Sequence, residues 1–221
     1  IADMLKKVAI HFVPMTNPDG VSLSQFGIDA IRSDALKQVI RDCYSRDVNL
    51  KRTADSFETY LTKWKANAGG VDLNYNFPYG WDELATKLTE PSSASYKGPA
   101  PFSEPESQAL AKLADQYPWA ITVSYHSQGQ VIYWTTSSNG AEMASNTLAE
   151  AVSVMTGYRM DSSDGKGGFK DWMQSRSGAV PGVTLEVGKT PCPVPFSEFP
   201  QVWKQNKGVW VQVLDYVVRR I

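Results

Sequence analysis

Two side chains that could carry out chemistry lie where apolar, strand-like runs of the sequence end. His126 follows the run at residues 120–125, and a neutral imidazole at a strand end can bind a metal ion or move a proton. Glu186 interrupts the apolar run at residues 183–187, where a buried carboxylate is costly unless it is paired or has a chemical task. Partial desolvation moves a carboxyl pKa towards neutrality, which is what a general base requires. The structural alternatives are a hydrogen-bonded histidine and a glutamate in a salt bridge.

Alternating strands and helices are needed to present these residues at strand ends, where the reactive groups of open α/β sheets gather. Strand-like runs occupy residues 8–14, 120–125, 131–135 and 183–187, and a strand-to-loop transition occupies residues 69–78. Helical spacing occurs within residues 22–66, after residues 103–106, at residues 141–156 and at residues 200–218. The pattern predicts an α/β fold with a mixed, mostly parallel central sheet and helices on both faces. His11, the other histidine, lies inside the first run, so we expect a structural role for it.

Size and charge limit the possible partners. A chain of 221 residues, of which 42% are apolar, can bury one sizeable core, so we predict a single domain over residues 1–221. Lys and Arg number 22 against 23 Asp and Glu, which leaves no global field to attract nucleic acid or an anionic membrane. No apolar run approaches the roughly 20 residues that span a bilayer. A small or peptide-sized partner is therefore expected, with no nucleic acid and no membrane span.

The cysteines and the start of the chain say less about function. Cys43 and Cys192 lie far apart and form neither a metal knuckle nor a disulfide framework, so the compartment stays open. Ile1 is not an initiator methionine, and an apolar run follows it closely. We therefore expect a fragment boundary here, with the N-terminal part of the domain missing.

Four motifs occur in a fixed order: Asn-Pro-Asp-Gly at residues 17–20, Gly-Val-Asp-Leu-Asn-Tyr-Asn-Phe at 70–77, Ser-Tyr-His-Ser at 124–127 and Thr-Leu-Glu-Val-Gly at 184–188. Together they resemble the carboxypeptidase A-like zinc metallopeptidases across almost the whole chain. Trp-Lys-Ala-Asn at residues 64–67 and Gly-Phe-Lys-Asp-Trp at 168–172 are most similar to bacterial cell-wall members that cut γ-D-glutamyl-diaminopimelate bonds. The resemblance implies a zinc carboxypeptidase-like fold and a hydrolase acting on peptides.

The resemblance also implies a set of catalytic residues. One zinc ion is held by the His and Glu of a His-x-x-Glu element and by a later His, which corresponds to His126. Glu186 corresponds to the base that takes a proton from the metal-bound water and passes it to the leaving amine. Arg32, about fifteen residues after Asn17, corresponds to the arginine that stabilises the oxyanion, and its structural alternative is a solvated helix charge. No His-x-x-Glu occurs in this sequence, so two further ligands are expected upstream of the chain.

Substrate-binding residues follow from the same resemblance. Asn74 is followed by Tyr75 where exopeptidases of the family pair Asn with Arg to bind a terminal carboxylate, which argues against ordinary carboxypeptidase recognition. Lys170 lies in the segment that lines the pocket beyond the cleaved bond, where it would favour an acidic group such as the extra carboxylate of diaminopimelate. A surface lysine is the alternative there. Tyr158 is the candidate for the mobile tyrosine that caps the substrate.

Three other functions are compatible with parts of the pattern. A metallocarboxypeptidase would remove C-terminal residues. A non-catalytic peptide- or cell-wall-binding relative would keep the pocket without the metal, although such a protein has little need of Glu186. An unrelated α/β hydrolase could use Ser127, but no Gly-x-Ser-x-Gly motif surrounds that residue.

Overall fold

A computed structural model describes residues 1–135, 140–163 and 165–220 and divides the chain into two compact units. Unit 1 comprises Ile1–Val13, Tyr117–Gly165 and Phe169–Ile221, and unit 2 comprises Pro14–Gln116 and Lys166–Gly168. Each unit has a hydrophobic core of its own. The single domain over residues 1–221 stays a prediction.

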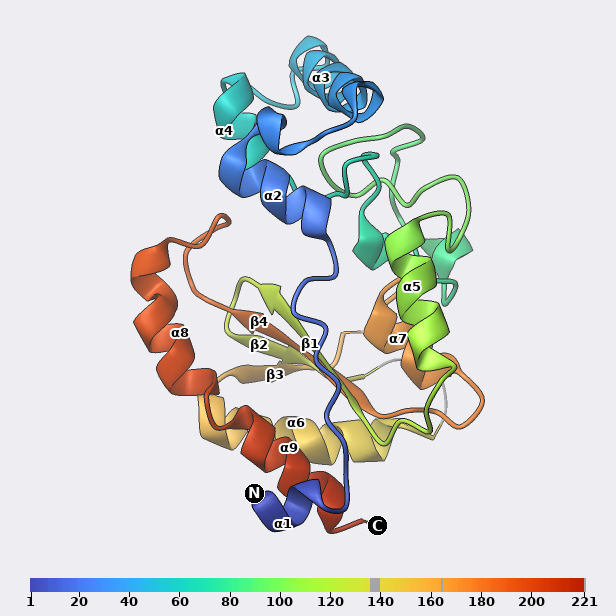
Figure 1. Ribbon diagram of the computed structural model, residues 1–221, viewed down its shortest axis with the longest axis vertical. Coiled ribbons are helices and arrows are strands. Elements are labelled where there is room, and N and C mark those ends of the chain that lie inside the picture. Colours follow the sequence, from blue (N-terminus) through green and yellow to red (C-terminus); the bar gives the residue numbers. More distant parts are fainter. Residues whose placement is uncertain (136–139, 164, 221) are drawn as a thin grey trace. The chain divides into compact units, whose positions relative to one another are not determined.

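Unit 1 is built on a four-stranded mixed sheet (Figure 1). Its strands are β1 (Thr122–Ser127), β2 (Val131–Tyr133), β3 (Arg159–Asp161) and β4 (Gly182–Val187). They lie in the order β1-β4-β2-β3, with β1 parallel to β4, β2 parallel to β3, and β2 antiparallel to β4. The prediction of a mixed, mostly parallel sheet is confirmed, and three of the four strands coincide with predicted runs.

Helices cover both faces of this sheet. The helices of unit 1 are α1 (Ala2–Leu5), which contacts α9, then α6 (Glu142–Thr156), α7 (Phe169–Ser175), α8 (Phe199–Asn206) and α9 (Val209–Val218), and a short helical turn, η4 (Phe196–Glu198), precedes α8. Helix α6 packs on β2, β3 and β4 beside α9, on the face where Val183 and Leu185 are fully buried. Helix α7 contacts β1 and β4, and its Lys170 stem lies 3.4 Å from where a Cβ at Gly182 would stand. Gly182 and Glu186 share the opposite face, because side chains alternate along a strand.

A glycine divides the predicted C-terminal helix into two. Residues 200–218 were expected to form one amphipathic helix, but α8 ends at Asn206 and α9 begins at Val209 after Gly208. A Cβ at Gly208 would stand 2.9 Å from the Met155 sulfur of α6. Glycine thus permits the close approach of α6 but weakens the helix at that point.

Unit 2 is mostly helical, as the spacing within residues 22–66 predicts. Its elements are α2 (Pro18–Phe26), η1 (Ile28–Ala30), α3 (Asp34–Asn49), α4 (Phe57–Thr62), η2 (Leu73–Tyr75), η3 (Trp81–Glu83) and α5 (Pro105–Ala114). The side chains of Asn17, Ser33 and Ser56 cap α2, α3 and α4 by accepting a hydrogen bond from a first-turn backbone N–H. Such caps satisfy donors that a helix start leaves unpaired.

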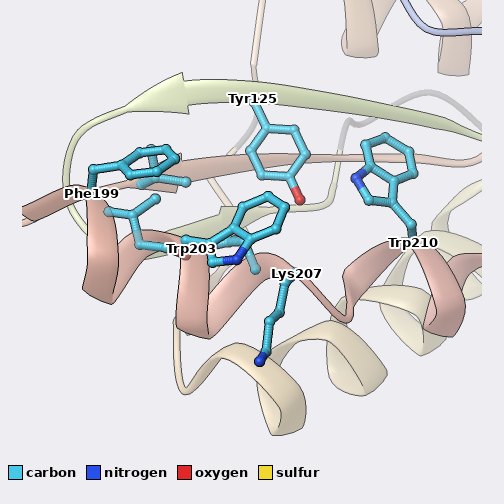
Figure 2. Close-up of a pocket in the computed structure, with 8 residues that line it drawn as sticks. Tyr125, Phe199, Trp203, Lys207 and Trp210 are labelled. Carbon is cyan, nitrogen blue, oxygen red and sulfur yellow. Dashed lines mark hydrogen bonds between the residues drawn. The ribbon is translucent and has the colours of Figure 1, made fainter.

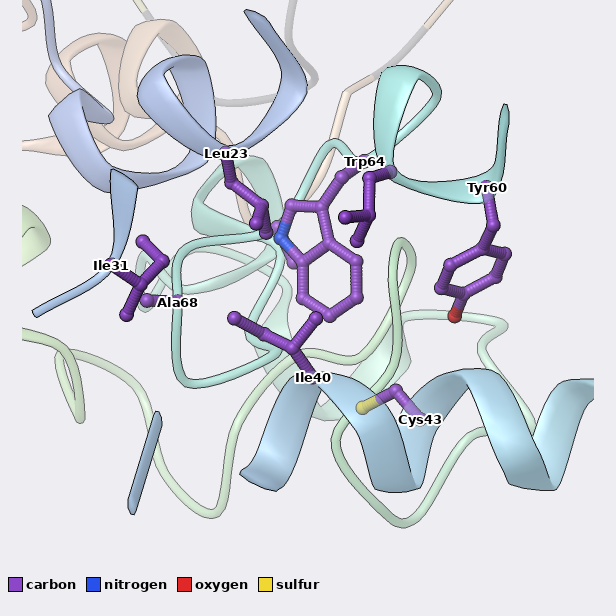
Figure 3. Close-up of a cluster of buried hydrophobic side chains, with 9 residues drawn as sticks. Leu23, Ile31, Ile40, Cys43, Tyr60, Trp64 and Ala68 are labelled. Atoms are coloured by element: carbon purple, nitrogen blue, oxygen red, sulfur yellow. The ribbon is translucent and has the colours of Figure 1, made fainter. Parts of the chain in front are cut away.

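The core of unit 2 surrounds the Trp64 indole, which Figure 3 shows among Leu23, Ile31 and Ile40. Trp64 is buried, and its Nε1 donates a hydrogen bond to the Asn67 backbone oxygen at 3.1 Å. A buried indole N–H requires such an acceptor. The Trp-Lys-Ala-Asn motif therefore anchors its segment in this core.

Two predicted strands are wrong. Residues 8–14 and residues 69–78 contain no strand, because neither pairs with a strand of the described sheet. His11 and Phe12 are exposed and instead contact aromatic rings, His11 with Tyr117 and Phe12 with Trp210. Apolar β-branched runs form strands only when a neighbouring strand accepts and donates the ladder hydrogen bonds.

Among the residues described, none of the helices is long and apolar enough to cross a membrane.

Candidate active site

His126 and Glu186 lie side by side at the ends of two parallel strands. The register of β1 and β4 pairs His126 with Glu186, one residue before the last pair of the ladder. Neighbouring strands are about 4.8 Å apart, so the two side chains leave the same face of the sheet as neighbours. Both residues are half-buried, and the Glu186 Oε2 atom is shielded from solvent. An imidazole and a carboxylate in this arrangement can bind a cation or exchange a proton.

Burial of the alternate residues fixes which way Glu186 points. Val183 and Leu185 are fully buried in the core beneath α6 and α9, so Thr184 and Glu186 must face the other side. A slip of one residue would place a carboxylate in that apolar core, which is strongly unfavourable. The apolar residues of β4 thus determine the orientation of its acidic residue.

The loop that follows β4 is also held in place. Gly129 N–H donates to the Gly188 backbone oxygen at 3.0 Å, which ties the two strand ends together. The Glu198 carboxylate accepts hydrogen bonds from Lys189 N at 2.8 Å and Thr190 N at 3.1 Å. Hydrogen bonds from the Thr190 hydroxyl and from the Lys189 backbone lower the pKa of the Glu198 carboxyl. The backbone beyond Glu186 is therefore well supported.

Ser127, the candidate nucleophile of the hydrolase alternative, ends β1 on the surface. Its hydroxyl oxygen lies 3.5 Å from the sulfur of Cys192, an exposed free cysteine. A serine hydrolase needs a base within hydrogen-bond reach of the nucleophile. A thiol in that place does not supply one, so the structure gives this alternative no support.

The described residues were compared with what a zinc site requires. Within the ranges that the structure describes, no group of three or more His, Cys, Asp or Glu side chains is arranged to hold a metal ion. Zinc sites in enzymes use three protein ligands. His126 can provide one nitrogen ligand at a strand end, and the described residues do not complete the set.

Lys170 is buried rather than on the surface. Its ammonium donates to the Thr135 backbone oxygen at 2.8 Å and to Gln174 Oε1 at 3.2 Å, and it lies 2.5 Å from Asp171 Oδ1. These contacts match the three donors of an ammonium group. The alternative of a surface lysine is wrong, while recognition of an acidic substrate group stays a prediction.

Tyr158 lies in the core of unit 1. It is buried, and its hydroxyl accepts a hydrogen bond from Asn206 Nδ2 at 2.9 Å. Burial raises the pKa of the Tyr158 hydroxyl. These contacts give Tyr158 a structural role in the conformation described, and its role as a capping residue stays a prediction.

Three predicted site residues belong to unit 2. Arg32 is exposed just before α3, and its role at the oxyanion stays a prediction. Asn74 and Tyr75 are half-buried in η2. Lys65, which sequence reasoning did not assign to the site, holds its ammonium 5.4 Å from the centre of the Tyr75 ring. The signal that could have revealed Lys65 is its place in the Trp-Lys-Ala-Asn motif.

A pocket in unit 1 lies on the other side of the β1–β4 pair. It has a volume of about 260 Å³, and Figure 2 shows Tyr125, Trp203 and Trp210 around it. Its lining residues are Tyr125, Val187, Phe199, Val202, Trp203, Asn206, Lys207 and Trp210. Tyr125 and Val187 alternate with His126 and Glu186 along their strands, so the pocket opens on the face away from the carboxylate.

Comparison with known proteins identifies the family to which this chain belongs. The model of the zinc carboxypeptidase family matches residues 1–208, and the chain belongs to that zinc-dependent family. It is 33% identical to a γ-D-glutamyl-L-diamino acid endopeptidase of Lysinibacillus sphaericus, over 94% of this chain and 49% of the relative. It is 30% identical to the uncharacterised protein YqgT of Bacillus subtilis, over 96% of this chain and 54% of that protein. The chain thus spans about half the length of the curated relatives it matches.

The solved structure of a carboxypeptidase A from Helicoverpa armigera shares the fold. It superposes with a TM-score of 0.58 over 92% of this chain and 51% of its own, at 16% sequence identity. At this identity the likeness concerns the fold alone. It confirms the predicted zinc carboxypeptidase-like architecture.

Proposed function

We propose that the full-length protein is a zinc-dependent peptidase that hydrolyses γ-D-glutamyl-diaminopimelate bonds in peptidoglycan peptides. The observation that carries the proposal is the pairing of His126 with Glu186 at adjacent strand ends. It occurs in a chain of the zinc carboxypeptidase family that is 33% identical to an endopeptidase of that specificity class. A half-buried carboxylate beside a metal-ligating imidazole suits general-base catalysis.

In this proposal His126 provides one zinc ligand. When bound, the zinc ion polarises the scissile carbonyl and makes its water more acidic. Glu186 takes the proton of the attacking water and donates it to the leaving amine. Arg32 offers its guanidinium donors to the negative charge that develops on the carbonyl oxygen.

The substrate-binding residues complete the proposal. Asn74 and Tyr75 contact the substrate backbone and its carboxylate region. Tyr158 would cover the bound peptide only after it leaves its bond with Asn206, and Lys170 would bind an acidic group only in exchange for one of its three present contacts. A tyrosine after Asn74 carries no charge with which to bind a C-terminal carboxylate, and this is why we prefer an endopeptidase to a carboxypeptidase.

A metallocarboxypeptidase is the second candidate, because the matching family model describes zinc carboxypeptidases. The products formed from two sets of peptides, one with free and one with amidated C-termini, distinguish the endopeptidase from the carboxypeptidase. The full-length protein should cleave the γ-D-glutamyl-diaminopimelate bond whether the C-terminus of the peptide is free or amidated, as mass spectrometry of the products would show. Stepwise release of C-terminal residues from free peptides only would favour the carboxypeptidase. Binding without cleavage of either set would favour the non-catalytic relative.

A further inference from the structure

A row of aromatic side chains lies exposed along η4 and α8 of unit 1. Phe196 is 86% exposed, Phe199 52% and Trp203 58%, and their spacing of three and four residues places them on one side of this helical segment. The planes of the Phe196 and Phe199 rings differ by 2° with centres 5.7 Å apart, and those of Phe199 and Trp203 differ by 23° with centres 6.3 Å apart. Large aromatic rings that gather in one exposed patch indicate a binding surface.

This aromatic row continues into the pocket beside β1. Phe199 and Trp203 belong both to the row and to the pocket, whose other aromatic walls are Tyr125 and Trp210 (Figure 2). The Trp210 ring lies 6.0 Å from the Tyr125 ring, and Phe12 packs edge-on against Trp210 at 4.9 Å. Pockets for drug-sized ligands have volumes of about 300–1,000 Å³. A pocket of about 260 Å³ therefore suits a single ring-sized group.

Two polar groups of the pocket wall lack a hydrogen-bond partner among the described residues. The first is the Tyr125 hydroxyl, which Figure 2 shows directed into the pocket. Partial burial raises the pKa of this hydroxyl to about 12, so it remains a donor at neutral pH. The second is the buried Asn206 Oδ1, while Asn206 Nδ2 donates to the Tyr158 hydroxyl and to the Val202 oxygen, both at 2.9 Å. A buried acceptor without a protein donor indicates a bound water or ligand.

The lining residues favour an uncharged ligand that forms hydrogen bonds. Among the eight residues that line the pocket only Lys207 is charged, and Figure 2 shows its ammonium directed away from the aromatic rings. An ionic ligand would lose hydration here without gaining a counter-charge, and a hydrocarbon chain would leave Tyr125 and Asn206 unpaired. A neutral sugar ring meets both conditions. Its slightly positive C–H groups pack on the negative faces of aromatic rings, and its polar groups both donate and accept.

We propose that this pocket and the aromatic row bind a glycan strand of β-linked N-acetylated hexosamines, with one pyranose ring against the Trp203 indole. The N–H of an acetamido group donates to Asn206 Oδ1, directly or through one bound water. The pocket lies on the face of the β1–β4 pair away from Glu186, so the glycan is a ligand separate from the cleaved peptide. Its source rests on the proposed function, because peptidoglycan carries its peptides on such strands.

Sugar binding can be measured without peptide cleavage. Isothermal titration of the full-length protein would use chitotetraose, which is built of N-acetylglucosamine, and cellotetraose, which lacks the acetamido groups. Trp203→Ala removes the aromatic surface, Trp203→Phe keeps a ring, and Tyr125→Phe removes only the hydroxyl. Phe26→Ala is the matched control, because Phe26 is 73% exposed at the end of α2 and does not line the pocket.

The wild-type protein should bind chitotetraose about 3- to 10-fold more tightly than cellotetraose, because the acetamido group adds a hydrogen bond. Trp203→Ala should weaken chitotetraose binding about 10-fold or more, Trp203→Phe should weaken it less, and Tyr125→Phe should weaken it about 3- to 10-fold. Phe26→Ala should leave the affinity unchanged. A wild-type protein that does not bind chitotetraose, binds the two sugars equally, or binds chitotetraose no more tightly than Trp203→Ala would overturn the proposal.

Hydroxyl-radical footprinting of the full-length wild-type protein covers the case in which the variants do not fold. Phe199 and Trp203 should be oxidised in the free protein and protected by chitotetraose, whereas Phe26 should react equally in both samples. A Trp203 that is unreactive in the free protein would be covered by another part of the protein, and this would overturn the proposal, as would a lack of protection. A protein that binds chitotetraose at Trp203 but cleaves no peptide would instead refute the proposed activity and leave the glycan site standing.

Discussion

Replacement of Asn17 tests whether the Asn-Pro-Asp-Gly motif organises unit 2. In Asn17→Ala the protein loses one hydrogen bond from Gly20 N to Oδ1 at 3.0 Å and two from Nδ2, to the Lys65 and Ala66 oxygens. The first bond caps α2, and the other two join the start of that helix to a segment almost fifty residues further along. Asn17→Ala therefore removes a local role and a tertiary role together.

The expected loss follows from these three bonds. Loss of an N-cap costs about 1 kcal/mol. The Ala66 residue is fully buried, so loss of its bond leaves an orphaned carbonyl and costs about 1–1.5 kcal/mol. The bond to Lys65 is exposed, where water can replace it at a cost of about 0.5 kcal/mol or less. Together Asn17→Ala should lower the free energy of unfolding by about 2–3 kcal/mol.

Asn17→Ser is the matched control, because serine caps a helix about as well as asparagine but cannot reach the two carbonyl groups. It should lower the free energy of unfolding by only about 1–2 kcal/mol. Urea titration of the full-length protein, followed by circular dichroism, measures both losses. A loss below about 1 kcal/mol for Asn17→Ala, or no loss for Asn17→Ser, would refute the tertiary role of Asn17.

Further predictions concern packing and the two cysteines. Gly20→Ala should lower the free energy of unfolding by about 2–3 kcal/mol in the same titration, because its Cβ would stand 2.4 Å from the Ala66 oxygen; an unchanged midpoint would contradict this. Iodoacetamide at pH 8 should alkylate the exposed Cys192 and spare Cys43, which is 1% exposed. Peptide mass mapping measures both, and alkylation of Cys43 in preference to Cys192 would contradict this. Burial raises the pKa of the Cys43 thiol from 9.0 to about 11. The contribution of the neutral Cys43 thiol to the free energy of unfolding is therefore fully present below pH 9 and is lost as pH rises towards 11. Unfolding titrations across this range should show a decline of up to about 2–3 kcal/mol that Cys43→Ala reduces.

Much of unit 1 could be predicted from the sequence because its apolar runs are strands in a buried sheet. The strands at residues 122–127 and 182–187 and the helix at residues 142–156 coincide with predicted elements to within two residues. A short strand leaves only a weak pattern in the sequence, and β3, with only three residues, was not predicted. The strand predicted at residues 8–14 was wrong, because strand formation depends on a partner that local sequence does not reveal.

The sequence indicated which residues could belong to the site better than it indicated which of them lie next to one another. His126 and Glu186 were identified separately as candidates, but their pairing depends on β4 lying next to β1, with β2 and β3 elsewhere in the sheet. Lys65 was not assigned a role, because its contacts with Asp72 and Tyr75 arise from a loop with little regular structure. Tyr158 and Lys170 were expected at the substrate, and the burial of both could not be inferred from spacing alone.

Glu186 is the residue that we propose as the general base of a zinc peptidase. Its most direct test is to measure zinc content and kcat on a γ-D-glutamyl-diaminopimelate peptide for the full-length wild-type protein and its Glu186→Gln variant. Glu150→Gln is the control, because Glu150 is exposed on α6 and bonds only to Asn146 among the described contacts. We predict stoichiometric zinc in all three proteins and a fall in kcat of about 10²- to 10⁴-fold in Glu186→Gln alone. A wild-type protein without zinc, or a Glu186→Gln variant with undiminished kcat, would contradict the account.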